Sequence, residues 1–175
     1  MKIKFKSVKF RLILIFIVIL STLTLSNLWA IFNFKVLNNT VEKIFDSNYK
    51  SIAAAQQMES IIERQDSLQL SYLSTKDQKY IDAFIKAEKE FQNFLKQAKN
   101  NVTEKGEKDF VSELDTSYNS YINTFYKFLA KENLQTEYYF SEIFPKFEKI
   151  KSTCKNLLEL NQNAMILKRK EADIT

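Results

Sequence analysis

Two charged side chains near the middle of the chain have the types and spacing of a ligand site. The residues three and four positions from Arg64 carry no carboxylate, so its own helix cannot neutralise the guanidinium, which shares a face with apolar residues. A planar guanidinium of this kind binds a carboxylate or a phosphate. The alternatives are an ion pair with another helix or a side chain that extends to solvent. Asp66 also lacks a partner at these spacings, and Arg64, Gln65 and Asp66 form the candidate ligand-binding set.

Helical geometry limits how these residues act together. Asp66 points roughly 200° around the helix from Arg64, so the two cannot form one compact site on a single helix. At most one of them faces the core of its own subunit, and the other is expected to face a dimer partner. Asn161 has core spacing, between Leu157 and Ala164. A buried amide there would fix helix register or partner number, and the alternative is an exposed position.

Composition narrows the function classes. The chain has 175 residues with one Gly, one Pro, one Cys and no His. Without His there is no catalytic triad, His-based metal site or phospho-accepting His, and one Gly excludes phosphate-binding loops rich in glycine. Cys154 cannot form an internal disulfide and is expected to be a small buried hydrophobic residue. We therefore expect no catalytic residue, no metal and no cofactor, and not an enzyme.

The scarcity of Gly and Pro favours a few long helices. Apolar residues at three-and-four spacing predict helices over 33–73, about 77–100, about 109–130 and 136–175, with breaks at 74–77, 102–108 and 133–135. These apolar positions, which include Met58, Phe84, Phe91, Tyr118, Tyr121 and Phe125, are expected to form the core. Pro145 indicates that the fourth helix starts nearby or kinks there. Short connections favour neighbouring helices that run in opposite directions. The predicted fold is all-α, an antiparallel up-down-up-down four-helix bundle with two long and two short helices.

The positive charge is concentrated at the N-terminus. Five of the 26 basic residues precede residue 12, and the remaining 21 equal the 21 acidic residues, so we expect no nucleic-acid partner. The apolar segment 12–32 is long enough to cross a membrane as a helix. The positive-inside rule places residues 1–11 in the cytoplasm and residues 33–175 outside it. The alternative is a cleaved signal peptide, because Ser and Thr soften the second half of the segment.

The helical segments resemble a known family. The chain resembles the extracytoplasmic four-helix sensor of KinB-type bacterial sensor histidine kinases and, more loosely, the four-helix ligand domains of methyl-accepting chemotaxis receptors. The resemblance covers residues 33–170 and rests on Ser47-Asn48-Tyr49, Ala53-Ala54-Ala55-Gln56-Gln57-Met58, Glu63-Arg64-Gln65-Asp66-Ser67, Tyr72-Leu73, Asn101-Val102-Thr103, Gly106-Glu107, Tyr139-Phe140, Pro145, Phe147-Glu148, Leu160-Asn161-Gln162 and Ala164-Met165.

The resemblance implies a homodimer in the bacterial cell membrane that senses a small-molecule or protein ligand and passes the signal by helix displacement. The last residues carry no helix-ending Gly or Pro, so we expect a second membrane span and an output module beyond Thr175. A histidine kinase is the expected output. The alternatives are a chemoreceptor ligand domain and a membrane-anchored envelope protein that binds or scaffolds without a signalling output.

Overall fold

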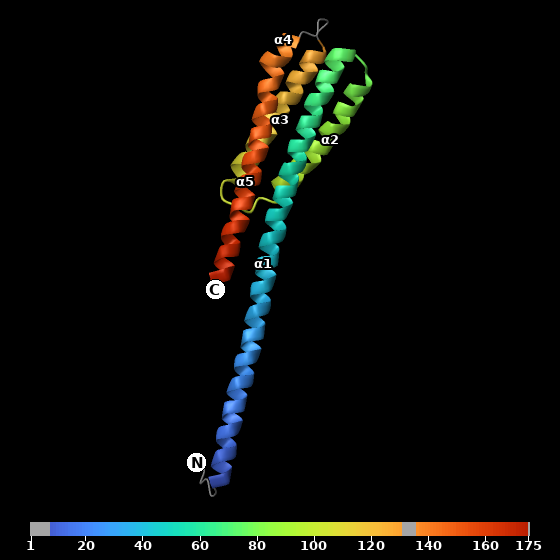
Figure 1. The fold of residues 1–175 in the computed structure, drawn as a ribbon. Coiled ribbons are helices and arrows are strands. Elements are labelled where there is room, and N and C mark those ends of the chain that lie inside the picture. Colours follow the sequence, from blue (N-terminus) through green and yellow to red (C-terminus); the bar gives the residue numbers. More distant parts are fainter. Residues whose placement is uncertain (1–7, 131–135, 175) are drawn as a thin grey trace. The chain divides into compact units, whose positions relative to one another are not determined.

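A computed structural model describes residues 8–130 and 136–174, and every element in these ranges is helical. The elements are α1 (Val8–Thr75), α2 (Lys79–Asn100), α3 (Glu107–Leu129), α4 (Thr136–Tyr138), the π-helix η1 (Tyr139–Ile143) and α5 (Phe144–Ile174), as Figure 1 shows. The chain divides into two compact units, Met1–Lys43 and Ile44–Thr175. The all-α prediction is confirmed, and the connection predicted at 133–135 lies outside the described residues.

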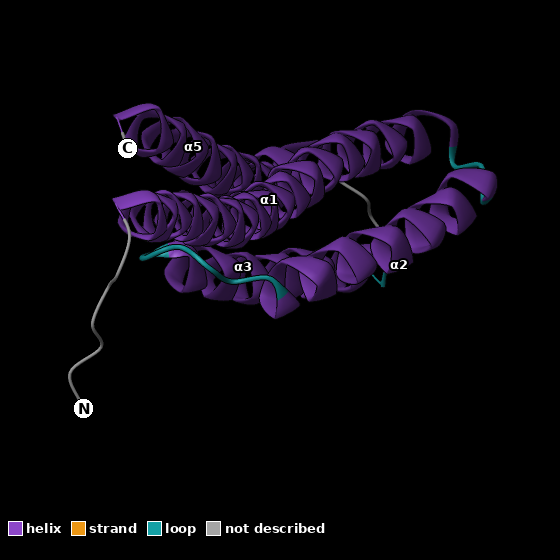
Figure 2. Cartoon of the chain, turned by 90° about the horizontal axis from the view of Figure 1, so that it is seen from below, coloured by secondary structure: helices purple, strands orange, loops and turns teal. Residues whose placement is uncertain are grey.

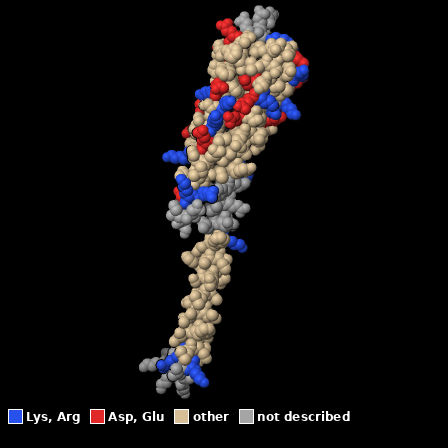
Figure 3. Space-filling model, viewed as in Figure 1, with Lys and Arg blue, Asp and Glu red and all other residues tan. Residues whose placement is uncertain are grey.

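The first unit contains the apolar part of α1. Its stretch Lys9–Val36 has 28 residues, the most apolar 18-residue window of the stretch has a mean hydropathy of 2.2, and none of that window is buried. Figure 3 shows this part of α1 as largely free of charged side chains. By length and composition it can cross a membrane, although a signal sequence at the N-terminus has the same properties. The predicted span 12–32 lies within it, and residues 1–7 of the basic tail lie outside the described residues.

Four polar residues of this stretch form hydrogen bonds within the helix. Ser21, Thr22 and Thr24 donate their hydroxyl protons to backbone carbonyls three or four residues earlier, and the side-chain amide of Asn27 does the same. A side chain that bonds to its own helix leaves fewer unpaired polar atoms to place in hydrocarbon. These residues are therefore compatible with a membrane span.

The second unit is built around one hydrophobic core. Residues 47–75 of α1 and helices α2, α3 and α5 lie side by side in Figures 1 and 2, and η1 adds Tyr139 and Ile143 to the same core. Most of the predicted apolar positions are buried, whereas Leu68, Tyr72, Tyr80, Phe94 and Ala164 are only partly buried. The buried set includes Ala54, Met58, Ile61, Phe84, Ala87, Phe91, Ala98, Val111, Leu114, Tyr118, Tyr121, Phe125, Phe128, Phe147, Ile150, Cys154 and Leu157.

Two residues with positive φ mark the ends of helices. Lys76 follows α1 with φ 57° and donates its backbone N–H to the carbonyl of Tyr72 at 2.8 Å, which caps the last turn. Gly106 precedes α3 with φ 87°, a conformation that glycine adopts without steric cost. The predicted breaks at 74–77 and 102–108 are therefore real helix ends.

The single proline lies at the start of α5. Pro145 has no backbone N–H to donate to the carbonyl of Ser141, four residues earlier, so a regular α-helix loses a hydrogen bond there. The wider π-turn of η1 occupies this position, and α5 begins at Phe144. The expectation that the fourth helix starts or kinks near Pro145 is confirmed.

Candidate functional site

Two glutamines of α1 meet two tyrosines of α3 in the core. Gln65 and Gln69 lie one turn apart, and both are buried. The side-chain amide of Gln65 donates from Nε2 to the hydroxyl of Tyr118 at 3.0 Å, and that hydroxyl donates to Oε1 of Gln65 at 3.2 Å. Nε2 of Gln69 donates to the hydroxyl of Tyr121. The pairs supply hydrogen bonds to polar groups that burial removes from water.

The rings of these tyrosines continue into α2. Tyr118 stacks on Phe91 with ring centroids 3.7 Å apart, and Tyr121 lies against Phe84 at 6.2 Å. Burial raises the pKa of Tyr118 and of Tyr121 well above the usual range. Both hydroxyls therefore stay protonated and keep their donors at physiological pH. The arrangement holds α1, α2 and α3 in fixed register through aromatic stacking and hydrogen bonds.

Asp66 binds a third tyrosine, which lies in η1. The hydroxyl of Tyr139 donates to Oδ1 of Asp66. Burial raises the pKa of the Asp66 carboxyl, the hydrogen bond from Tyr139 opposes this, Glu148 adds to it and Lys151 lowers it. Burial and the bond to Asp66 together raise the pKa of Tyr139. Asp66 thus faces η1 and α5 of its own chain. We call the six residues that make these bonds the tyrosine cluster: Gln65, Asp66, Gln69, Tyr118, Tyr121 and Tyr139.

Arg64 lies apart from this cluster. Its guanidinium forms an ion pair with Glu90 of α2, and its side chain is 50% exposed. The expectation that Arg64 shares the face of the apolar residues is wrong. The next residue, Gln65, lies on that face and bonds to Tyr118, whereas Arg64 points to Glu90 of α2. The ion pair with another helix, left open by the sequence, is present. As expected, Arg64 and Asp66 point to different neighbours and do not form one compact site.

A second polar cluster surrounds the connection between α2 and α3. Glu107, which is buried, accepts hydrogen bonds from the backbone N–H groups of Thr103 and Glu104 at 2.7 and 3.0 Å. Its other oxygen accepts from Nδ2 of Asn161 in α5 at 3.1 Å. The hydroxyl of Thr103 donates to Oδ1 of Asn48 in α1 at 3.4 Å. One short loop therefore contacts both α1 and α5.

Further bonds tie the same loop to α1. Nδ2 of Asn101 donates to the carbonyl of Ser47 at 2.6 Å and to the hydroxyl of Ser51 at 2.9 Å. On the other side of the loop, Lys168 of α5 forms an ion pair with Glu104. We define the loop cluster as the side chains of Asn48, Ser51, Asn101, Thr103, Glu107 and Asn161, of which Thr103 is exposed and the others are buried or partly buried.

Asn161 is part of the packed interior of its own chain. It is buried, and its Nδ2 also donates to the carbonyl of Leu157, one turn earlier, at 3.0 Å. Its predicted core position is therefore confirmed, and the alternative of an exposed position is wrong. The register that Asn161 fixes in this structure is that of α5 against the 101–106 connection and Glu107 of the same chain.

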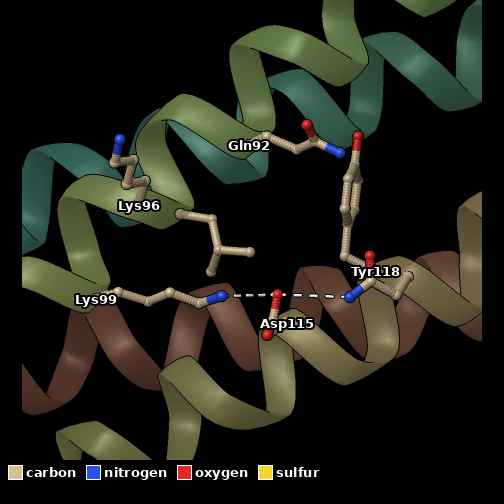
Figure 4. Close-up of a pocket in the computed structure, with 7 residues that line it drawn as sticks. Gln92, Lys96, Lys99, Asp115 and Tyr118 are labelled. Carbon is tan, nitrogen blue, oxygen red and sulfur yellow. Dashed lines mark hydrogen bonds and ion pairs between the residues drawn. The ribbon is translucent and has the colours of Figure 1, made fainter.

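A pocket of about 290 Å³ opens between α2 and α3, and Figure 4 shows it. Helix α2 contributes Gln92, Leu95, Lys96 and Lys99, and α3 contributes Asp115, Tyr118 and Asn119. Lys99 and Asp115 reach toward each other across the pocket and form an ion pair at 2.8 Å. The pocket also meets the tyrosine cluster, because Tyr118 lines the one and belongs to the other.

Sequence reasoning placed Tyr118 and Tyr121 in the core without a polar role, and it did not single out Gln69 or Glu107. A signal for the glutamines exists. Gln65 falls between Ile61 and Leu68 in the three-and-four pattern of α1, so a core position could have been assigned to it. The role of Glu107 depends on a loop conformation that no periodic pattern encodes.

Comparisons with known proteins give no relative. No family model matches the chain, and neither a curated protein nor a solved structure is significantly similar to it.

Proposed function

We propose that the chain is the extracytoplasmic sensing portion of a bacterial transmembrane receptor, one that controls a histidine kinase. The observation that carries this proposal is that α1 contains both the exposed apolar stretch Lys9–Val36 and buried residues of the helical core, among them Met58 and Ile62. A helix with both properties can serve as membrane anchor and as part of a folded domain. The basic residues before this stretch favour a cytoplasmic N-terminus.

The arrangement proposed for the second unit is an antiparallel up-down-up-down four-helix bundle of α1, α2, α3 and α5. Short connections at 76–78 and 101–106 support it, since brief links join helices that run in opposite directions. The shared hydrophobic core supports it as well. Helices α2 and α3 have 22 and 23 residues and α5 has 31, so the two short helices cover only part of the long ones.

The receptor is proposed to be a homodimer. Large apolar side chains are exposed on the helices that would form the interface: Tyr49 and Leu70 on α1, and Ile166 and Leu167 on α5. Neighbouring exposed apolar side chains, such as Ile166 and Leu167, favour contact with another protein surface, and two-fold dimers are the commonest soluble assembly.

Signalling in this proposal is a small displacement of α5 against α1. Shifts of about 1–2 Å at helix interfaces are typical of such switches, and a coupling of roughly 1–3 kcal/mol changes output several-fold. Glu63 of α1 forms an ion pair with Lys151 of α5 at 2.6 Å, and Asp66 of α1 accepts a hydrogen bond from Tyr139 of η1, which leads into α5. The loop cluster bonds to both helices, so a displacement must strain or rearrange it.

A crosslink between α1 and α5 tests the proposal. The chain would be fused after Thr175 to a second membrane span and the autokinase module of a characterised receptor. Glu63→Cys and Lys151→Cys place two thiols where an ion pair now joins the helices, and a short bismaleimide would link them. Native Cys154 does not compete, because burial raises the pKa of its thiol to about 12. We expect the link to change the autophosphorylation rate about fivefold or more.

The control uses the same reagent within one helix. Glu59→Cys with Glu63→Cys puts both thiols on α1, four residues apart, so the link leaves α5 free to move. We expect no change in kinase rate with this pair. Equal rates before and after crosslinking of the α1–α5 pair would overturn the displacement mechanism and favour an envelope protein that binds or scaffolds without signalling.

A further inference from the structure

The pocket between α2 and α3 contains Lys96, an exposed cationic side chain with no ion-pair partner among the described residues. Of its two lysines, Lys99 is paired with Asp115, and Nδ2 of Asn119 donates to the same carboxylate at 3.5 Å. Lys96 has no ion-pair partner among the residues that the structure describes. The lining thus carries two positive charges and one negative charge, and an anion would balance it.

The remaining lining is suited to an apolar group beside that anion. Leu95 is buried, and Tyr118 turns its ring toward the pocket while its hydroxyl bonds to Gln65. Gln92 contributes a side-chain amide at the end of the pocket near Tyr118, as Figure 4 shows. Amide N–H groups donate to carboxylate oxygens, whereas the leucine and the ring favour hydrocarbon.

We propose that this pocket binds a small organic anion, a carboxylate with a short apolar chain. The carboxylate lies at Lys96 and the chain lies against Leu95 and the ring of Tyr118. A volume of about 290 Å³ suits a molecule of fewer than a dozen heavy atoms. Binding itself is independent of signalling, and only the role of the pocket as sensory input rests on the proposed function.

The pocket has a direct route to α1. A bound molecule that presses on Tyr118 acts on a ring stacked against Phe91 and on a hydroxyl that exchanges two hydrogen bonds with Gln65. Gln65 belongs to the candidate set found in the sequence, and here it acts through Tyr118 and does not line the pocket. Occupancy of the pocket would therefore bias the position of α1 against α3.

Hexanoate is the probe for this proposal, and hexan-1-ol is its neutral counterpart. The full chain in nanodiscs would carry 3-fluorotyrosine, and the ¹⁹F resonance removed by Tyr118→Phe identifies residue 118. We expect hexanoate to shift this resonance saturably and to leave that of exposed Tyr49 in place. Hexan-1-ol should shift it weakly or not at all. Restricting the readout to residue 118 separates pocket binding from partition into lipid.

Lysine variants locate the anion. Lys96→Gln should weaken hexanoate binding by about fivefold or more, because it removes the charged partner. Lys86→Gln neutralises an exposed lysine of α2 outside the pocket and should leave binding unchanged. No saturable shift, equal affinity in Lys96→Gln, or loss of binding in Arg64→Gln in place of Lys96→Gln would overturn the proposal.

The result of the hexanoate-binding test is independent of the result of the crosslinking test of the proposed function. Failure of hexanoate to bind would leave the crosslinking test of the kinase fusion unaffected. Conversely, hexanoate binding that depends on Lys96, together with a kinase rate that the α1–α5 crosslink does not alter, would keep the pocket and reject the receptor.

Discussion

The side-chain amide of Gln65 and the hydroxyl of Tyr118 exchange two hydrogen bonds, at 3.0 and 3.2 Å, in the core of the helical unit. Each group satisfies the other where no solvent reaches. The pair joins α1 to α3, and Tyr118 also lines the pocket between α2 and α3. The contact between Gln65 and Tyr118 therefore connects the pocket to α1, the helix that contains the apolar stretch Lys9–Val36.

The first prediction concerns this pair. Tyr118→Phe leaves both polar atoms of Gln65 without their partner, which should lower the free energy of unfolding by about 1–3 kcal/mol. Gln65→Leu alone should also destabilise the chain, because it leaves the hydroxyl of Tyr118 unpaired. The double variant should lose less than the sum of the two, since no buried polar atom of the pair remains. Urea unfolding of the full chain in nanodiscs, followed by circular dichroism, measures all three. Strictly additive losses would contradict the contact.

The second prediction concerns the ion pair of Arg64 with Glu90, whose side chains are 50% and 36% exposed. Exposed pairs contribute little, because water and salt screen them. In a cycle of Arg64→Gln, Glu90→Gln and the double variant, the coupling energy should stay below about 1 kcal/mol. A coupling above about 2 kcal/mol would mean that the pair is more shielded from water than the structure shows.

The third prediction concerns the loop cluster. Asn161→Leu keeps an apolar side chain of similar size in α5 but removes the donor to Glu107, whose buried oxygen then lacks a partner. We expect a loss of about 1–3 kcal/mol in the free energy of unfolding. Asn163→Leu, on the exposed side of the same helix, should stay within about 0.5 kcal/mol of the parent. Equal urea midpoints for the two variants would show that Asn161 does not support Glu107.

The fourth prediction is a pH dependence at Asp66. Burial raises the pKa of this carboxyl above 3.8, the hydrogen bond from Tyr139 and the charge of Lys151 oppose the rise, and Glu148 adds to it. The folded chain therefore holds the proton more tightly than the unfolded chain does. Consequently, the contribution of Asp66 to stability is present at low pH and is lost as pH rises from near 3.8 through the raised pKa.

Asp66→Asn isolates this effect, because the amide oxygen can still accept from Tyr139 but does not ionise. Subtracting the urea stability curve of this variant from that of the parent should give a difference that falls as pH rises above 3.8. Asp109→Asn, at an exposed aspartate of α3, keeps Asp66, so the stability curve of this variant should itself retain the Asp66-dependent fall. A difference curve for Asp66→Asn that is flat or rises with pH would contradict the burial of the carboxyl.

Much of the fold follows from periodicity. The spacing of Phe84, Ala87 and Phe91 places them on one face of α2. The spacing of Val111, Leu114 and Tyr118 likewise places them on one face of α3, and all six residues are buried. The break after Leu73 and the change near Pro145 follow from local chemistry, because turn residues and a missing N–H act within a few positions. Such features depend on residues that are close together in the sequence, so they can be predicted from it.

The contacts of the candidate site depend on neighbours in space and were only partly predictable. Arg64 was assigned to the wrong face because Arg64 and the adjacent Gln65 both fit the three-and-four spacing of the apolar residues. In the structure Gln65 is buried and Arg64 is exposed. The partners Glu90 and Tyr139 lie on other helices, at distances in sequence that no spacing rule encodes. The role of Glu107 could not be predicted, because it depends on the fold that brings the loop and Asn161 together.

The central claim is that α1 anchors the helical unit on the outer side of a bacterial membrane. Asn93 is exposed on α2, outside the helices of the proposed dimer interface, so Asn93→Cys offers an accessible thiol while native Cys154 stays buried. A membrane-impermeant maleimide applied to intact cells should label this thiol as fully as it does after lysis. The labelled chain should keep its full mass and remain in the membrane fraction after an alkaline wash. Labelling only after lysis, or a shortened chain in the soluble fraction, would contradict the claim.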